Sequence, residues 1–444
     1  MNARSQRPER ASAAARIVAI IVLTVMAACG HARASGITLS GDTTADLERL
    51  GLTARGPALP AEERLLLRSL ESISHARLDE AQQNLGTLLS LHPDFHLARV
   101  MLADVLMARG GRFVDFASGA AGERVDMLRA EARARLASAR EAAEPGRVPD
   151  VLLQLSASQR SAVVVDVAAS RLYLYANEGT GPRLVRSYYA STGKNGAVKH
   201  REGDQRTPLG VYFVAGRING ESLPDFYGPG ALPVNYPNEW DLRHGRTGYG
   251  IWIHGVPSDT FARAPRASDG CIAVSNPYLA ELLELPGPLD TPVIIGNALR
   301  WIDAGELSVR GREFAARVDA WRRDWESGDV DRYARHYSRE FRSDDQDLDA
   351  WLTHKRRINA AKSYIRVGLH DMSMFAYPGE RDVVVVGFEQ DYKSSNFANR
   401  TRKRQYWQRE PDGRWRIVYE GSAKLRSEQL RGIPFSARAY LSQR

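Results

Sequence analysis

The hydrophobic pattern of this chain changes its period twice, and this change constrains the fold more than any other feature. Apolar residues recur every three to four positions over residues 61–143, which predicts amphipathic helices. Short β-branched and aromatic runs then continue to residue 299, and beyond it helical spacing returns before a set of long strands. A single core rarely accommodates 444 residues. The three patterns therefore predict a multidomain protein.

The first 34 residues have the pattern of an export signal. Arginines crowd the first 16 residues, and the apolar run of residues 17–28 follows at once. As a helix this run spans only about 18 Å, short of a hydrocarbon core of about 30 Å. We predict a signal peptide over residues 1–34, cleaved after Ala32-Arg33-Ala34, and hence a periplasmic protein. A lipobox-like segment ending at Cys29 is the alternative, and it would make the protein a lipoprotein.

Residues 35–150 are predicted to form an α-helical module. Helices are expected between residues 61 and 111, with breaks near residues 74–76 and at Pro93, and again over residues 122–143. The part around Pro93 resembles one tetratricopeptide-like helix pair. Such a pair needs a neighbour to bury its apolar face. We therefore expect it to pack on the next domain or on a partner, either a second copy of the chain or an envelope protein.

Residues 155–299 are predicted to form a mostly-β sandwich or barrel. The expected strands lie close together without helices between them, which is typical of an antiparallel or mixed sheet. A single helix is expected over residues 276–285, with Asn276 as its cap and Pro277 in its first turn. The expected strands are residues 162–166, 171–175, 184–190, 210–215, 251–254 and 291–296.

Residues 308–444 are predicted to form an α+β domain. A helical hairpin is expected around residues 327–329 and another helix over residues 349–362, and strands are expected over 383–392, 402–409 and 415–420. Helices followed by a curved antiparallel sheet, together with the opening WESGDVDRYARHYS, resemble the cone-shaped nuclear-transport-factor-like and SnoaL-like domains. This accessory domain is the second candidate for contact with a second copy or an envelope protein.

The segment from Gly250 to Asn276 carries the chemistry. Its sequence is GIWIHGVPSDTFARAPRASDGCIAVSN, in which His254 ends an apolar strand and Cys271 follows 17 positions later. A thiol is mostly protonated near neutral pH, so a nucleophilic cysteine needs a neighbouring base. We therefore predict that Cys271 is a nucleophile and that His254 is its base.

Four residues beside this pair are assigned supporting roles. Ser268 is expected to hydrogen-bond the imidazole or the loop backbone, and Asp269 is expected to orient His254. Gly270 permits strained backbone angles, and its amide is expected to line an oxyanion site together with that of the nucleophile. Gly255, directly after the base, completes the set.

The loop of residues 199–207 supplies the candidates for substrate binding. This loop contains Arg201, Arg206 and Thr207 together with Lys199. The cations of Lys199, Arg201 and Arg206 could bind substrate carboxylates; a solvated loop is the alternative. One thiol and one imidazole lack the further ligands of a metal site. Because no nucleotide or flavin motif occurs either, we predict that the protein needs no cofactor.

Residues 161–296 resemble the L,D-transpeptidase (YkuD) catalytic domain family. The motifs that carry the resemblance are VVVDVAASRLYLY, then STGK followed by TPLG, and finally IHG with SDGC. The resemblance implies an enzyme of the bacterial envelope that acts on peptidoglycan stem peptides, with Cys271 as nucleophile and His254 as base. Such enzymes attack a tetrapeptide, release D-Ala and pass the acyl group to an amine, which forms a crosslink.

Two positions depart from the family pattern. Asp269 stands where the family usually has a second histidine, and Ala273 stands where an arginine is common. A subset of the family with this kind of signature hydrolyses its substrate, and the domain order resembles cell-shape L,D-carboxypeptidases. We therefore predict a peptidoglycan L,D-transpeptidase, with an L,D-carboxypeptidase or crosslink hydrolase as the alternative. A degenerate scaffold that binds cell wall is the alternative of another class.

The net charge of +8 is unevenly distributed. Residues 1–34 contribute +4, residues 35–300 contribute −2 and residues 301–444 contribute +6. Without the leader, the excess of basic residues therefore lies in the accessory domain and not in the catalytic part. This distribution excludes nucleic acid as the expected partner. It favours an accessory surface attracted to an anionic cell wall.

Overall fold

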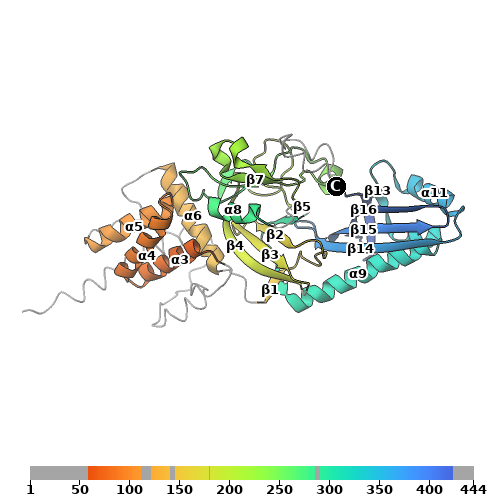
Figure 1. The fold of residues 1–444 in the computed structure, drawn as a ribbon, viewed down its shortest axis with the longest axis horizontal. Helices are drawn as coiled ribbons and strands as arrows, with labels where there is room; N and C mark the ends of the chain where they lie inside the picture. Colours follow the sequence, from red (N-terminus) through yellow and green to blue (C-terminus); the bar gives the residue numbers. More distant parts are fainter. Residues whose placement is uncertain (1–58, 112–121, 141–145, 180, 286–290, 424–444) are drawn as a thin grey trace, which may run out of the picture.

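The computed structural model describes residues 59–111, 122–140, 146–179, 181–285 and 291–423. Within these ranges a helical module, a central β domain and a C-terminal α+β domain follow one another along the longest axis of the molecule (Figure 1). The predicted multidomain architecture is therefore confirmed. The predicted leader, including Cys29, lies outside the described residues.

In its described residues, 59–111 and 122–140, the helical module contains α3 (Ala61–Ser74), α4 (Leu78–Leu91), α5 (His96–Arg109) and α6 (Glu123–Arg140). The predicted breaks near residues 74–76 and at Pro93 are both present, since α4 begins after the first and α5 after the second. Leucines repeat at helical spacing, and Leu66, Leu85 and Leu88 are completely buried.

The central domain is built around one mixed sheet in which the strand order is β5-β11-β2-β3-β4-β10-β8-β7-β6. Strand β9 also pairs with β4. The longer strands follow their predicted positions: β2 (Ser161–Asp166), β3 (Arg171–Asn177), β4 (Pro182–Gly193), β5 (Gly210–Phe213) and β11 (Pro292–Gly296). The short strands are β6 (Ile218–Asn219), β7 (Gly230–Pro233), β8 (Trp252–His254), β9 (Arg266–Ser268) and β10 (Ile272–Val274).

Three helical pieces interrupt the loops of this domain, and two more strands tie its ends together. The helical pieces are the single 3-10 turns η1 (Gly220–Ser222) and η2 (Asp225–Tyr227) and the short helix α7 (Glu239–Arg243). The chain enters through β1 (Arg147–Pro149) and leaves through β12 (Trp301–Asp303), and these two strands pair with each other.

Helix α8 covers Asn276–Leu283, and its N-cap is Ser275. The prediction that Asn276 caps this helix is therefore wrong, because the side chain of Asn276 is used elsewhere.

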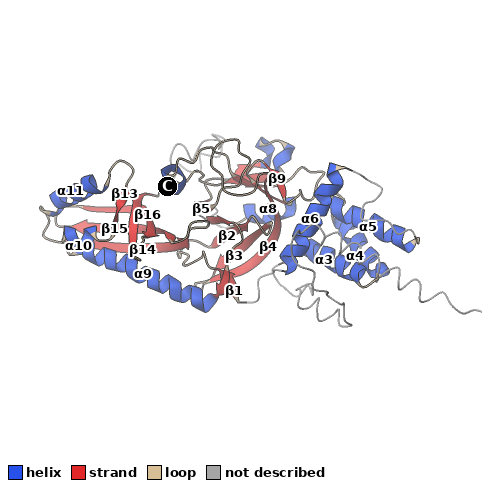
Figure 2. Ribbon diagram, turned by 180° about the vertical axis from the view of Figure 1, so that it is seen from behind, coloured by secondary structure: helices blue, strands red, loops and turns tan. Residues whose placement is uncertain are grey.

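The C-terminal domain packs helices against a five-stranded sheet of order β13-β17-β16-β15-β14. Its helices are α9 (Ala304–Glu326), α10 (Val330–Ala334) and α11 (Leu348–Asn359), and the long helix α9 runs beside the sheet (Figure 2). Strands β15 (Val383–Ser394), β16 (Ala398–Arg409) and β17 (Trp415–Ser422) contain the predicted ones. Strands β13 (Tyr337–Arg342) and β14 (Ile365–Ala376) were not predicted from the sequence.

A buried ionic cluster joins the helical module to the central domain. Glu63 of α3 accepts hydrogen bonds from Arg135 of α6 and, at 2.8 Å, from Arg171 of β3. Glu131 pairs with the same Arg135 at 2.8 Å. These side chains are almost completely buried. Because charges in such a position are costly unless paired, the cluster fixes the module on the sheet.

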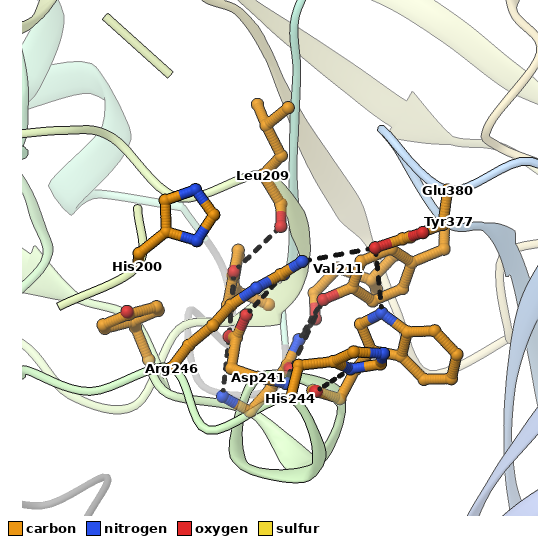
Figure 3. A network of polar contacts seen from close by, with 12 residues as sticks. His200, Leu209, Val211, Asp241, His244, Arg246, Tyr377 and Glu380 are labelled. Atoms are coloured by element: carbon orange, nitrogen blue, oxygen red, sulfur yellow. Dashed lines mark hydrogen bonds and ion pairs between the residues drawn. The ribbon is translucent and has the colours of Figure 1, made fainter. Parts of the chain in front are cut away.

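A second polar network joins the central domain to the C-terminal domain. Figure 3 shows Arg246 between the carboxylates of Asp241 and Glu380, at 3.1 and 3.2 Å. Asp241 also accepts a hydrogen bond from the hydroxyl of Tyr212 at 3.0 Å. Burial raises the pKa of Asp241 to about 6, although Arg246 opposes that rise. Asp241 precedes the loop that leads to β8, the strand that ends at His254. The C-terminal domain therefore supports the chain that enters this strand.

Candidate active site

Two short parallel strands bring Cys271 and His254 together. His254 ends β8, and Cys271 directly precedes β10. The two strands are paired in parallel, with Ala273 level with His254. Side chains two residues apart on a strand point to the same face. Cys271, two residues before Ala273, therefore lies toward the same face of the sheet as His254, one strand away.

The imidazole of His254 is held in one tautomer. Its Nδ1 lies 2.7 Å from the carbonyl oxygen of Gly255. A carbonyl can only accept, so Nδ1 carries the proton and Nε2 is left as a proton acceptor. His254 is buried, and this burial lowers its pKa to about 4; the nearby charge of Arg263 acts in the same direction. The imidazole is therefore neutral at pH 7 and competent as a base.

The thiol of Cys271 is protonated at rest. Its Sγ lies 3.4 Å from the carbonyl oxygen of Gly250, which accepts the S–H hydrogen bond. Burial raises the pKa of the thiol to about 11, and a backbone hydrogen bond from Trp252 partly opposes this. Both partners are thus uncharged before substrate arrives. Proton transfer from the thiol to the imidazole must therefore accompany the attack on the substrate.

The turn before Cys271 explains the need for glycine at position 270. Gly270 has a φ of +126°, and a Cβ there would lie 2.7 Å from the carbonyl oxygen of Arg206. Thr207 donates to the carbonyl of Gly270 at 3.0 Å and accepts from the amide of Gly193 at 2.9 Å. Thr207 therefore holds the nucleophile's turn in place.

Ser268 organises the backbone of the same turn. Its hydroxyl donates to the carbonyl of Cys271 at 2.6 Å and accepts from the amide of Gly270 at 3.2 Å. Of the two partners expected for Ser268, the structure thus selects the loop backbone. The amide of Gly270 is engaged by this hydroxyl, so the predicted oxyanion role has no free donor at that amide.

Asp269 does not contact His254. Its exposed carboxylate pairs with Lys194 at 3.0 Å and accepts from the side chain of Gln205 at 3.0 Å. The prediction that Asp269 orients the imidazole is therefore wrong. The physical reason is the turn itself, which directs the side chain of Asp269 outward to the loop of residues 194–206, while a backbone carbonyl orients His254 instead.

Asn276 is a positioning residue that sequence reasoning missed. Its Oδ1 accepts from the amide of Val256 at 2.8 Å. The same oxygen occupies the space that a Cβ at Gly255 or at Gly228 would need. Gly255 is therefore required by close approach, and Asn276 fixes the chain directly after His254. An Asn-Pro pair at a helix start points to a cap, so the sequence offered no signal for this contact.

The predicted substrate-binding loop is partly a structural feature. Lys199 is buried and pairs with Asp204 at 2.8 Å, and Arg206 donates to the carbonyl of Ala197 at 3.0 Å. Arg201 is exposed. Two of the cations therefore brace the loop, whereas Arg201 faces solvent.

In the described ranges, no group of three or more histidine, cysteine, aspartate or glutamate side chains could hold a metal ion. In the same ranges no helix is both long enough and apolar enough to cross a bilayer.

Comparison with known families identifies the central domain. Residues 160–295 match the family model of the L,D-transpeptidase catalytic domain, and they include both strands of the candidate pair. The chain contains a YkuD-type catalytic domain. Residues 313–421 match the Cds6 C-terminal NTF2-like domain, which follows the YkuD-type domain. Both predicted resemblances are therefore confirmed.

Two solved structures are similar to the greater part of this chain. Bd1075 of Bdellovibrio bacteriovorus is 27% identical, with a TM-score of 0.55, and the match covers 62% of this chain and 97% of that one. The helical cell shape determining protein Pgp2 of Campylobacter jejuni is 26% identical, with a TM-score of 0.51, and the match covers 61% of this chain and 95% of that one. The search of curated proteins gave no match. Each of these two proteins thus matches this chain over nearly the whole of its own length.

Proposed function

We propose that the protein is a cysteine-dependent peptidoglycan L,D-transpeptidase that acts on tetrapeptide stems. The observation that carries the proposal is the pairing of β8 with β10. This pairing sets Cys271 and a neutral His254 on one face of a YkuD-type domain. From a protonated thiol with an unprotonated imidazole as its base, acyl transfer by a cysteine can proceed.

In the proposed acylation step, Nε2 of His254 takes the thiol proton as Sγ of Cys271 attacks the carbonyl carbon before the terminal D-Ala. The Sγ–C bond forms, the C–N bond breaks, and His254 returns the proton to the departing amine. D-Ala leaves and a thioester remains. An amine of a second stem then attacks the thioester, which gives the crosslink and frees the thiol.

An L,D-carboxypeptidase is the second candidate, in which water attacks the same thioester. Two observations favour it. The strand neighbours of His254 on both sides are alanines, Ala231 and Ala273, so no cation stands at position 273. In addition, a relative named as a helical cell shape determining protein matches 61% of this chain over 95% of its own length. Either activity supports a role in cell wall organisation and cell shape.

We also propose that the mature protein works in the periplasm. The basic and apolar pattern of residues 1–34 supports export, and the excess of basic residues in the C-terminal part suits an anionic cell wall. Peptidoglycan stem peptides are the proposed partners, and a second copy or an envelope protein is the further partner proposed for the helical or the NTF2-like domain.

Incubation of the purified protein with disaccharide-tetrapeptide tests the proposal. Dimers among the products indicate transpeptidation, and tripeptide alone indicates carboxypeptidation. Cys271→Ala should abolish both, and a carbapenem should add its mass to the wild-type protein but not to this variant. Undiminished turnover by Cys271→Ala would remove the assignment of the nucleophile, and a wild-type protein that gives no product would support the scaffold alternative.

A further inference from the structure

Arg263 lies on the loop that connects the two catalytic residues, and its side chain is directed to the His254 side of the site. Its Nη2 donates to the carbonyl of Phe226 at 2.8 Å, and its Cζ lies 3.8 Å from the centre of the Phe226 ring. That ring is 6.1 Å from the imidazole of His254. The ring of Tyr227 meets the same imidazole edge-on at 5.0 Å. Arg263, Phe226 and Tyr227 therefore form one wall beside the base.

The helical module holds this loop from the other side. Phe261 stacks on Phe95 with ring centres 4.3 Å apart, and its amide donates to the carbonyl of Asp94 at 3.2 Å. The ring of Phe261 also packs edge-on against Tyr278 of α8 at 6.0 Å. Two residues before Arg263, the chain is thus anchored between two elements. The position of the guanidinium is therefore fixed by tertiary structure, which favours recognition by preorganised groups.

The charge of Arg263 acts on the reacting pair. Burial accounts for most of the change in the pKa values of Cys271 and His254, and Arg263 lowers the pKa of both. Burial also lowers the pKa of Arg263 itself. Among the described residues, no carboxylate lies within ion-pair distance of its guanidinium. Arg263 is thus a half-buried cation beside the proposed nucleophile, and its guanidinium has N–H donors that no carboxylate of the described residues engages. Such a group is suited to bind an anion.

From this arrangement we infer that Arg263 binds the terminal carboxylate of the substrate residue that leaves. The inference rests on the proposed function, in which the peptide bond attacked by Cys271 precedes a C-terminal residue. The carboxylate of that residue lies about one residue length, ~3.8 Å, from the scissile bond. The strand next to His254 carries Ala273 and offers no cation, so the loop supplies it. The substrate class is thereby narrowed to peptides with a free C-terminal carboxylate.

Binding to a variant that cannot turn over tests the inference separately from the proposed function. The probes are disaccharide-tetrapeptide and its C-terminal amide, titrated into Cys271→Ala by calorimetry. We expect the free acid to bind about 30- to 100-fold more tightly than the amide, since one charge-assisted hydrogen-bonded pair is lost in the amide. Adding Arg263→Met should reduce this ratio to near 1, and Arg263→Lys should restore part of it.

Arg266→Met is the matched control, because Arg266 is an exposed arginine three positions after Arg263, at the start of β9. In the Cys271→Ala background it should leave the preference for the free acid unchanged. Equal binding of acid and amide by Cys271→Ala, or a preference that survives Arg263→Met, would overturn the inference. Turnover by the wild-type protein is read separately. Formation of dimers together with either result would leave the proposed transpeptidase intact and reject only the role of Arg263, and release of tripeptide alone would do the same for the carboxypeptidase alternative.

Discussion

At the level of single residues, burial sets the protonation of Cys271 and His254, the proposed catalytic pair. His254 has a pKa of about 4, well below the ordinary value of about 6.5, because charging a buried imidazole is costly. A base must be unprotonated to act, so activity should be lost as pH falls through the folded pKa. We expect kcat/KM for tripeptide release to stay flat from pH 8 to about 5 and to fall about tenfold per pH unit below 4. An acid limb near pH 6.5, measured where circular dichroism shows the folded protein, would contradict this protonation state.

Asp269 and Asp204 allow a sharper test at the level of single residues, because Asp269 forms an exposed pair whereas Asp204 holds the loop of residues 199–207 together. Asp269 forms an exposed pair with Lys194, and such pairs contribute little, so Asp269→Asn should change kcat/KM by less than about threefold. Asp204 accepts hydrogen bonds from the buried Lys199 and from the backbone amides of His200 and Arg201. Asp204→Asn should therefore lower both the melting temperature and the activity. Thermal unfolding and peptide release measure both variants. If Asp269→Asn lowers the melting temperature and the activity more than Asp204→Asn does, Asp269 acts on the site.

At the level of elements, the turn of residues 268–271 determines where the nucleophile lies. Gly270→Ala combines a positive φ with a clash against the carbonyl of Arg206, so we expect loss of activity together with a destabilisation of about 1–3 kcal/mol. Gly86→Ala is the control, because Gly86 is exposed in α4 with no atom close to an added Cβ. This variant should gain about 0.5–1 kcal/mol of stability and keep full activity. Chemical denaturation and peptide release measure both; an active Gly270→Ala protein would show that the turn tolerates a side chain.

The strands of the central and C-terminal domains also show which elements can be predicted from a single sequence. Runs such as β2 and β15 are long enough for their composition to identify them, whereas β9 and β10, with three residues each, are strands only because longer neighbours pair with them. Cys271 and His254 could be predicted because a motif in one short stretch contains both. Asn276 and Arg263 could not, since the contacts that give them a role come from loops distant in the sequence, and no local pattern specifies those contacts.

At the level of the whole molecule, both neighbouring domains contact loops of the catalytic domain. The helical module holds Phe261 on the loop that carries Arg263. Glu380 of the NTF2-like domain holds Arg246 on the chain that leads to Gly250, and Arg246 in turn pairs with Asp241. Glu239 of α7 additionally forms a buried pair with Arg404 of β16 at 2.9 Å. Buried pairs of this kind tie the domains into one structure, so the site depends on contacts that lie outside the matched catalytic segment.

Glu63 makes this dependence testable, because it joins the helical module to the sheet. Glu63→Ala leaves Arg171 without its carboxylate and Arg135 with Glu131 alone, and removing one partner from a buried charge pair costs about 3–5 kcal/mol. We expect the denaturation midpoint to fall and the activity to fall with it, because the anchor of Phe261 loosens. Asp79→Asn, which removes an exposed pair with Arg109, should alter neither quantity measurably. If Glu63→Ala lowers stability while kcat/KM stays at the wild-type value under native conditions, the helical module stabilises the chain without positioning the loop of Arg263.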